Sequence, residues 1–278
     1  MSWTLISDPD TDQRAPVARD LLIAAAREAG ALALGFFRPG ERTSAAVESK
    51  AGGSPVTAAD LAADSLLKQR LGAAFPEAGW LSEETADSGD RLARRSLIIV
   101  DPIDGTRAFV AGDPRWAVCA ALIVDGRPIA GVVHAPALLE TFAAALGEGA
   151  TLNGAPIAVS SRSDESPLSA AGPRPLLQSM GRRLGVSVNV VSRVPSLAYR
   201  ICTAARGGID FAVAAADSHD WDVAAADLIV AEAGGRLTEV SGDPLVYNTA
   251  GTRRGALLAT PVALAPRLLD AFRDALEG

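Results

Sequence analysis

The sequence passes from an apolar run into an acidic turn within one stretch, Ser96-Leu97-Ile98-Ile99-Val100-Asp101-Pro102-Ile103-Asp104-Gly105-Thr106. The apolar run predicts a fully buried β-strand that delivers Asp101 at its carboxyl end. Because Pro102 cannot donate to a β-ladder, we expect the strand to stop there. Asp101, the carbonyl group of Ile103 and Asp104 can then turn toward one point instead of alternating across a sheet.

The end of this stretch predicts an anion site. Gly105 and Thr106 would open a helix, whose free N–H groups and positive dipole end attract negative charge. Carboxylates beside such a site need a cation between them and the anion. On residue types alone, an ordinary strand-to-helix turn with an Asp cap explains the segment equally well, so both interpretations stay open.

Other acidic residues can complete a metal site. Glu83-Glu84 follows a short predicted strand, and Asp222 lies at the start of a predicted helix. Two like charges about 4 Å apart at an effective dielectric of about 20 repel by about 4 kcal/mol. If these acids converge with Asp101 and Asp104, they must therefore take up protons or bind divalent ions. All-oxygen ligands favour Mg²⁺, with Mn²⁺ as the second choice. Taken singly, each acid is equally typical of a solvated loop or a helix cap.

Composition and charge narrow the classes of protein. The chain has 278 residues, 49% of them hydrophobic, and 26 basic against 33 acidic residues give a net charge of −7. An acidic surface repels polyanions, so we expect no nucleic-acid polymer and no anionic membrane as partner, but a small phosphorylated metabolite can enter a local cationic site. Two cysteines, no leader-like segment and no long apolar run predict a cytoplasmic protein.

The length predicts one large domain or two packed parts, because single cores stop growing near roughly 250 residues. A polar run over residues 160–166, closed by Pro167, marks the expected boundary. Residues 1–160 would form an α+β part with the metal-binding motifs. Residues 161–278 would form a three-layer α/β part that completes the active site with Asp222.

Three local patterns stand out in the first part. The residues Val17, Leu21, Ala25, Glu28, Leu32 and Phe36 recur at helical spacing and predict a helix over residues 16–37 with one apolar stripe. Thr57, with Asp60 three residues later, predicts the cap of a second helix. Asp125-Gly126, between two apolar runs, predicts a hairpin with a type I′ turn.

Four motifs, in their order and approximate separations, resemble the signatures of the inositol monophosphatase superfamily. They are Glu83-Glu84, Asp101-Pro102-Ile103-Asp104-Gly105-Thr106, Gly147-Glu148-Gly149-Ala150 with Asn153-Gly154, and Trp221-Asp222-Val223-Ala224-Ala225 with Ala233-Gly234-Gly235. The resemblance covers roughly residues 18–272. It implies an α/β (α+β) fold, a layered αβαβα sandwich with mixed and antiparallel sheets. It also implies a magnesium-dependent, lithium-sensitive phosphoric monoester hydrolase that is commonly a homodimer.

The resemblance assigns the metal ligands by position. Glu83, Asp101 and the carbonyl group of Ile103 resemble the family's first metal site. Asp101, Asp104 and Asp222 resemble its second site. Two or three Mg²⁺ ions are implied, the third held weakly through water.

The resemblance also implies the catalytic and substrate-binding residues. Glu83, Asp60 and Thr106 would hold the water that attacks phosphorus in line, without a covalent intermediate. The amides of Gly105 and Thr106 would bind the phosphate group. Arg107 would contact substrate and could bind a second phosphate; a solvated surface arginine remains the alternative.

The substrate stays open at this level. Nucleotide- and histidinol-phosphate-type members of the family tend to carry a cation at the position of Arg107. The spacing of 12 residues from Asp210 to Asp222 resembles that of the adenosine bisphosphate phosphatases. The residues just before Asp222 and Ser82, which stands where many relatives have Gly, depart from the inositol-specific pattern. We expect a 3′(2′),5′-bisphosphate nucleotidase acting on adenosine 3′,5′-bisphosphate, or an inositol-1-monophosphatase, with histidinol-phosphate phosphatase as the alternative.

A protein of another class also remains possible on sequence grounds, namely a non-catalytic, regulatory protein that binds metal and phosphate. The pair Asp60 and Thr106 argues against it, because a mere binder has no need to position a water nucleophile. Lys50, ahead of Gly52-Gly53-Ser54-Pro55, matches a lysine common before the family's mobile loop, and a solvated lysine is the alternative.

Overall fold

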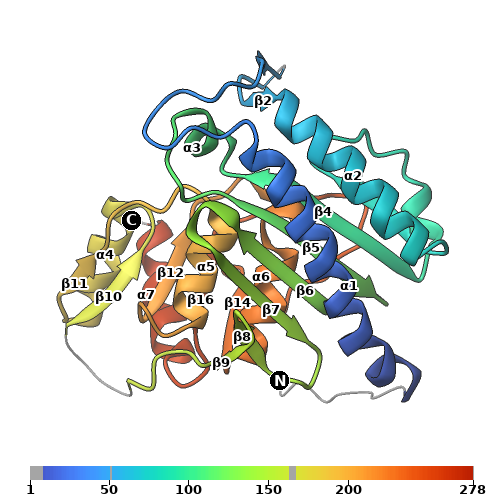
Figure 1. Ribbon diagram of the computed structural model, residues 1–278. Coiled ribbons are helices and arrows are strands. Elements are labelled where there is room, and N and C mark those ends of the chain that lie inside the picture. The colour runs from blue at the N-terminus through green and yellow to red at the C-terminus, as the bar shows by residue number, and fades with distance from the viewer. Residues whose placement is uncertain (1–8, 51, 163–166, 278) are drawn as a thin grey trace.

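The computed structural model describes residues 9–50, 52–162 and 167–277, which form five layers in the order αβαβα (Figure 1). The outer helices α1 (Pro9–Leu34) and α2 (Ala58–Ala74) cover one face of a seven-stranded sheet. Between this sheet and a five-stranded sheet lie α5 (Leu197–Ala205) and α6 (Asp220–Glu232). The last layer is α4 (Arg174–Leu184) with α7 (Ala265–Glu277). The expected layered fold is confirmed.

The first sheet has the strand order β3-β4-β5-β6-β7-β8-β9, with β3 and β4 parallel and all other neighbours antiparallel. Its strands are β3 (Gly79–Ser82), β4 (Ser96–Asp104), β5 (Ala117–Val124), β6 (Arg127–Ala135), β7 (Glu140–Ala145), β8 (Ala150–Leu152) and β9 (Ala155–Ile157). At the β5–β6 hairpin, Asp125 and Gly126 have φ angles of 50° and 77°, as a type I′ turn requires.

The second sheet has the order β11-β10-β12-β16-β14, in which β10 runs parallel to both neighbours and β16 antiparallel to both. Its strands are β10 (Leu168–Ala171), β11 (Val188–Val190), β12 (Phe211–Ala214), β14 (Gly235–Thr238) and β16 (Leu257–Pro261). The proposed boundary after residue 160 falls between the last strand of the first sheet and the first strand of the second.

The remaining elements are short. Two small antiparallel pairs join β1 (Val47–Ser49) to β2 (Pro55–Thr57) and β13 (Ser218–His219) to β15 (Arg253–Arg254). The five-residue helix α3 (Thr106–Val110) follows β4, and single 3₁₀ turns, η1 (Asp90–Ala93) and η2 (Pro136–Leu138), precede β4 and β7. None of the described helices combines the length and apolar character needed to cross a bilayer.

The apolar stripe predicted for the first helix is wrong. Val17 is 61% and Leu21 40% exposed, whereas the buried face of α1 consists mainly of alanines, with Leu22 among them. Small side chains let the helix approach the sheet closely: a Cβ atom on Gly30 would lie 2.7 Å from the ring of His134 in β6. The predicted stripe followed the large apolar residues, whereas the helix buries the face that carries its alanines.

Pro102 does not end the strand as expected. β4 continues to Asp104, but its register with β5 shifts: Asp101 lies opposite Cys119 and Asp104 opposite Ala117. Three steps along β4 thus match two steps along β5, which is a β-bulge. In a regular strand, residues three apart face opposite sides of the sheet. The extra residue allows Asp101 and Asp104 to face the same side.

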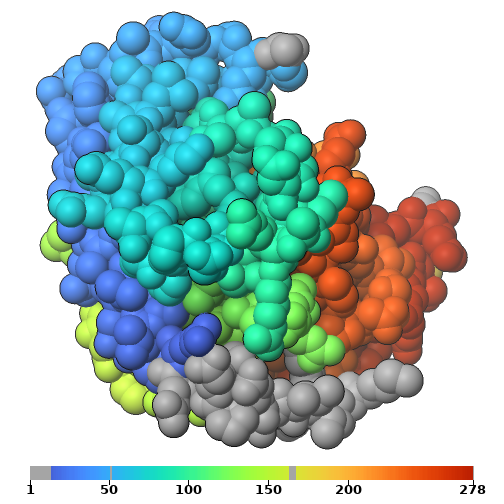
Figure 2. Space-filling view, turned by 90° about the vertical axis from the view of Figure 1, so that its right-hand side faces the viewer, coloured from blue at the N-terminus to red at the C-terminus, as the bar shows by residue number. Residues whose placement is uncertain are grey.

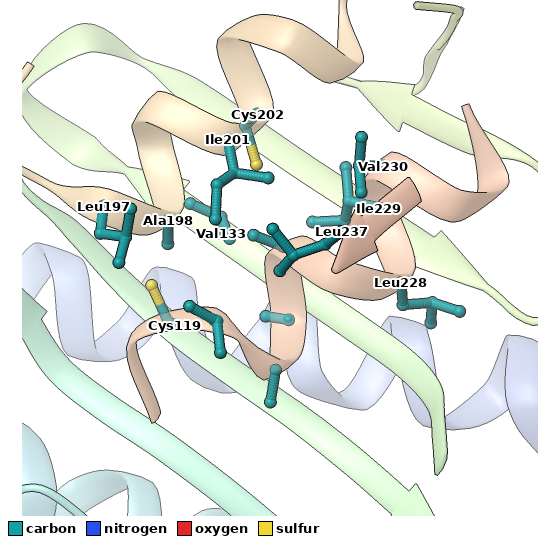
Figure 3. Close-up of a cluster of buried hydrophobic side chains, with 14 of the residues drawn as sticks. Cys119, Val133, Leu197, Ala198, Ile201, Cys202, Leu228, Ile229, Val230 and Leu237 are labelled. Atoms are coloured by element: carbon teal, nitrogen blue, oxygen red, sulfur yellow. The ribbon is translucent and has the colours of Figure 1, made fainter. Parts of the chain in front are cut away.

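The centre of the molecule is an apolar layer between the first sheet and the two inner helices (Figure 3). Cys119 from β5 and Cys202 from α5 both lie in this layer and are buried. Burial raises the pKa of each thiol well above its ordinary value, so neither cysteine is suited to act as a nucleophile.

Candidate active site

Three carboxylates converge at the end of β4. Asp101 and Asp104 come from its bulged end and Asp222 from the first turn of α6, and one oxygen from each lies within 4.8 Å of the others. Asp101 is 1% and Asp104 5% exposed. Residues more than a hundred positions apart in the sequence therefore form one acidic cluster.

Burial and mutual repulsion disfavour negative charge in this cluster. The pKa of Asp101 is raised well above its ordinary value by burial and by the charges of Glu83, Asp104 and Asp222. Burial and the charge of Asp104 likewise raise the pKa of Asp222. A divalent cation would relieve this repulsion, and a ligand set of carboxylates without His or Cys suits a hard ion such as Mg²⁺. The residues present thus fit the metal that the motifs imply.

Asp104 also accepts hydrogen bonds from groups at the N-terminus of α5. Its two carboxylate oxygens take hydrogen bonds from the Ser196 hydroxyl (2.6 Å) and from the backbone N–H groups of Leu197 (3.2 Å) and Ala198 (2.7 Å). Burial raises the pKa of Asp104 to about 6 against these hydrogen bonds, which favour the ionised form. Ser196 also caps α5, since its hydroxyl oxygen accepts the backbone N–H group of Tyr199 at 3.1 Å.

Glu83 lies beside the three-acid cluster and does not belong to it. Its carboxylate accepts a hydrogen bond from the ammonium group of Lys50 at 2.7 Å, and Glu84 accepts a second one at 2.8 Å. The charge of Glu83 nevertheless contributes to the raised pKa of Asp101. Burial raises the pKa of Glu84 to about 7, in spite of the nearby lysine. The predicted convergence of four acids is therefore seen for three, with the fourth bound to a lysine.

The predicted pair Asp60 and Thr106 is present. Thr57 and Asp60 form the capping box of α2, and Asp60 accepts a further hydrogen bond from the Thr106 hydroxyl at 3.2 Å. The same hydroxyl lies 3.1 Å from the carbonyl oxygen of Ile103, and its single hydrogen can serve one acceptor at a time. The predicted residues therefore meet at the junction of α2, β4 and α3.

Gly105 cannot be replaced without strain. Its φ angle is 94°, and a Cβ atom there would lie 3.3 Å from the backbone nitrogen of Ser196. Arg107, in the only full turn of α3, is exposed and has no ion-pair partner among the described residues. The structure thus places Arg107 at the surface next to the predicted phosphate-binding residues.

A hydroxyl–carboxylate cluster under Glu83 was missed by sequence reasoning. Asp64, one turn after Asp60 on α2, accepts hydrogen bonds from Ser82 (2.5 Å) and Thr85 (2.6 Å). The Ser82 oxygen also accepts the backbone N–H group of Glu84 at 3.2 Å. These bonds fix the chain on both sides of Glu83.

The residues just before Asp222 have separate roles. Asp217 is exposed and pairs with Arg253, while Asp220 is fully buried and bound to Arg254 at 2.6 Å. The half-buried ring of His219 stacks on Trp221, with centroids 4.5 Å apart. Asp220 therefore anchors the start of α6 and does not face a substrate.

The glycine-rich motif after β7 contacts the end of α6. The Glu232 carboxylate, at the end of α6, accepts the backbone N–H groups of Gly147 (3.0 Å) and Gly149 (2.8 Å). The glycine-rich turn after β7 is thereby tied to the helix that carries Asp222.

Comparisons with known proteins agree with this geometry. The model of the "Inositol monophosphatase family" matches residues 16–277. A "Histidinol-phosphatase" of Mycobacterium tuberculosis is 39% identical over 77% of this chain and 83% of its own length. "Inositol monophosphatase 2" of Solanum lycopersicum is 34% identical over 93% of this chain and 97% of its own.

A solved structure shares the architecture. The crystal structure of the extragenic suppressor protein suhB from Bartonella henselae superposes with a TM-score of 0.79, at 28% identity, over 92% of this chain and 98% of that one. The motif order, the acidic cluster and these matches lead to one conclusion. The chain belongs to the inositol monophosphatase family and is a phosphoric monoester hydrolase.

Proposed function

We propose that the protein is a magnesium-dependent phosphatase of small phosphate esters, and that its preferred substrate is a 3′(2′),5′-bisphosphate nucleotide. The convergence of Asp101, Asp104 and Asp222 carries the first half of this proposal. Two exposed arginines near the predicted phosphate-binding turn, Arg107 and Arg193, support the second half, since neither has an ion-pair partner among the described residues.

The metal ligands in this proposal are those that the motifs imply. Glu83, Asp101 and the Ile103 carbonyl group would hold one Mg²⁺, and Asp101, Asp104 and Asp222 a second. When bound, Mg²⁺ would supply a water of lowered pKa and neutralise charge on the phosphate group. A third, weaker ion and replacement by Mn²⁺ are part of the same proposal.

The chain's own residues orient the nucleophile. Asp60 is held by Thr57 and accepts from Thr106, so the Thr106 oxygen is fixed and can itself accept a hydrogen bond from the attacking water. Glu83 can accept the other hydrogen of that water. The N–H groups of Gly105 and Thr106 would donate to the phosphate group. Asp104 is held in place by its hydrogen bonds to the N-terminus of α5.

The exposed arginines Arg107 and Arg193 favour a substrate with a second anionic group. Arg107 is exposed and unpaired among the described residues, and the same holds for Arg193. Arg115 donates a hydrogen bond to the carbonyl group of Arg193 at 2.6 Å, and the charge of Arg193 acts on Arg200 close to Asp104. Arginines present planar, paired donors that suit phosphate oxygens.

Histidinol phosphate is the second candidate, favoured by the 39% identity to the M. tuberculosis histidinol-phosphatase. Its ammonium group would meet the positive charges of Arg107 and Arg193, which disfavours it. Inositol 1-phosphate stays a third candidate through the plant relatives. Inhibition by lithium and a homodimer, both implied by the resemblance, belong to the proposal as well.

A phosphate-release panel tests the proposal. Adenosine 3′,5′-bisphosphate, histidinol phosphate, inositol 1-phosphate and fructose 1,6-bisphosphate are compared with Mg²⁺, with Mg²⁺ plus Li⁺, and with chelator. We expect the highest kcat/KM on the nucleotide, inhibition by Li⁺ and no release in chelator. Arg107→Ala should raise KM for the bisphosphate more than for histidinol phosphate. A preference for histidinol phosphate that Arg107→Ala leaves unchanged would contradict the substrate assignment.

A further inference from the structure

The segment that begins the second part of the chain differs in charge from the rest. Residues 167–209 contain six arginines and no acidic residue, although the chain as a whole has a net charge of −7. Arg174, Arg182 and Arg183 belong to α4 and are exposed. Arg183 lies 3.5 Å from Asp274 on α7, whereas Arg174 and Arg182 have no ion-pair partner among the described residues. The surface around α4 is therefore positively charged on an otherwise acidic protein.

Strand β11 forms one edge of the second sheet and lies beside α4 (Figure 1). Among the described residues it pairs with β10 alone, and the backbone N–H group of Val191 donates to the carbonyl group of Ala170 in β10 at 2.9 Å. In a parallel ladder, alternate residues bond to the same neighbour. The backbone N–H and C=O groups of Val188 and Val190 therefore point away from β10, and no partner for them exists in the described part of the chain.

This edge lacks most of the features that prevent pairing with another strand. Natural edge strands are commonly protected by charged side chains, prolines or bulges. Residues 185–192 contain no charged residue and no proline, and four of the eight are valines, which favour extended backbone. The edge of β11 is thus open to a further strand.

A pocket lies beside this edge, where β11 meets the C-terminal end of α4. Its volume is about 550 Å³, and Gln178, Arg182, Ser187 and Val188 are among the residues that line it. Successive side chains of a strand added to β11 would point alternately to the α4 face of the sheet and away from it. An acidic side chain on the α4 face would meet the guanidinium group of Arg182 and the amide group of Gln178.

We propose that the free edge of β11 binds an extended, acidic segment of a partner protein, which adds to the second sheet as a further strand. The unpaired groups of Val188 and Val190 would bond to the backbone of this segment, and the arginines of α4 would attract its carboxylates. A nucleic acid matches the charge, but its backbone has no N–H groups for the free carbonyl groups. A second copy of this chain would set two basic segments against each other. None of these residues belongs to the proposed metal site, so binding does not depend on phosphatase activity.

Peptide selection tests the proposal without assuming a particular partner. Short linear peptides are selected from an unbiased display library on the immobilised protein, and the tightest is made synthetically. We expect the selected peptides to carry a net negative charge. In amide hydrogen exchange followed by NMR, the synthetic peptide should slow exchange at Val188 and Val190 by at least about tenfold. Exchange at Gly52, in the exposed turn between β1 and β2, should not change.

Two variants test the backbone pairing and the charge separately. Val190→Pro removes an N–H group that has no partner among the described residues, and Arg182→Glu reverses a charge at the pocket. Each should weaken binding of the synthetic peptide by at least about tenfold. Arg27→Glu, at an exposed position on α1, is the control and should bind the peptide like the natural protein. Thermal unfolding shows whether Val190→Pro is folded, and Arg182→Glu supplies the test if it is not.

Three results would contradict the proposal. They are a selection that enriches no acidic peptide, unchanged exchange at Val188 and Val190 when the peptide binds, and equal affinity of Arg182→Glu and the natural protein. Light scattering supplies a fourth. If the natural protein is a dimer that Val190→Pro or Arg182→Glu converts into a monomer, a second copy covers this edge and the proposal is wrong.

Discussion

The charge of Asp101 is unfavourable for the stability of the fold but suited to holding a cation. It is 1% exposed and its pKa is raised by burial and by four neighbouring carboxylates, so its charge destabilises the folded chain without a cation. The same crowding would favour the binding of a divalent ion. Residues kept for function at a cost in stability are a known property of enzyme sites.

Asp101→Asn separates these two effects. The amide oxygen can still accept the backbone N–H group of Ile103, now 3.0 Å from the carboxylate, so the turn is preserved. We expect kcat to fall at least a hundredfold, while Tm measured in chelator rises because a repelling charge is gone. The control is Asp125→Asn, at an exposed turn, which should leave both values near those of the natural protein. A variant that keeps its turnover would remove Asp101 from the metal site.

Ser82 tests the hydroxyl–carboxylate cluster under Glu83. In Ser82→Ala, Asp64 loses its 2.5 Å donor and Glu84 loses the acceptor of its backbone N–H group. We expect the free energy of unfolding to fall by about 1–3 kcal/mol, the usual cost of an unsatisfied buried group, and kcat to fall with it. Urea titration and initial rates measure the two effects.

Ser88→Ala is the matched control for this variant. Ser88 donates to Asp90 at the surface, so we expect a change within about 0.5 kcal/mol. Equal stability of both alanine variants would mean that the Ser82 bond contributes nothing.

Helix α6 carries its own buried charges besides the metal ligand. Asp227 is 4% exposed and accepts a hydrogen bond from Tyr247 at 2.9 Å. Burial raises the pKa of Asp227 to about 7. Because the ordinary value is near 4, the folded chain holds this proton more strongly than the unfolded chain does. The associated stability is complete below about pH 4 and is lost as the pH rises through about 7.

Asp227→Asn should abolish this dependence, since the amide oxygen can keep the bond to Tyr247. At pH 5, about one unit above the ordinary pKa, we expect the variant to be the more stable by only about 1.4 kcal/mol. At pH 8 the variant should be the more stable, by about 1.4 kcal/mol for each unit by which the pKa is raised. Urea unfolding in chelator at both pH values measures the difference. An unchanged difference between pH 5 and pH 8 would show that Asp227 does not titrate in this range.

Local signals predicted most of the elements but not their contacts. The capping box at Thr57 and the Asp125-Gly126 turn need only neighbouring residues, and both are confirmed. The bulge at Pro102 and the buried alanine face of α1 depend on packing against other elements, so the sequence pattern misled there. The bonds of Asp104 to α5 and of Lys50 to Glu83 join distant residues, and no spacing rule predicts them.

Across the whole molecule, the acidic cluster joins the two parts of the chain. Asp101 and Asp104 belong to the first part and Asp222 to the second. On one face, teal residues of the first part lie against orange residues near the C-terminus (Figure 2). There Arg91, 3% exposed, donates to the carbonyl group of Thr249, and Asn248 donates back to the carbonyl group of Arg91.

The same C-terminal segment also holds the start of α6. Arg254 binds Asp220 at 2.6 Å and stacks over the Tyr247 ring at 4.8 Å. One connecting segment therefore contacts the first part and also fixes the helix that carries Asp222. This arrangement explains how Asp222 is kept in register with Asp101 and Asp104 at the end of β4.

Calorimetric titration of the metal-free protein with Mg²⁺, repeated on Asp222→Asn, tests whether both parts build one cation site. Asp217→Asn, at an exposed position in the same segment, is the control. We predict saturable Mg²⁺ binding by the natural protein and by Asp217→Asn. Asp222→Asn should bind at least one ion fewer and should lose its phosphate-release activity. No Mg²⁺ binding by the natural protein, or unchanged binding by Asp222→Asn, would contradict the assignment of this cluster as the metal centre.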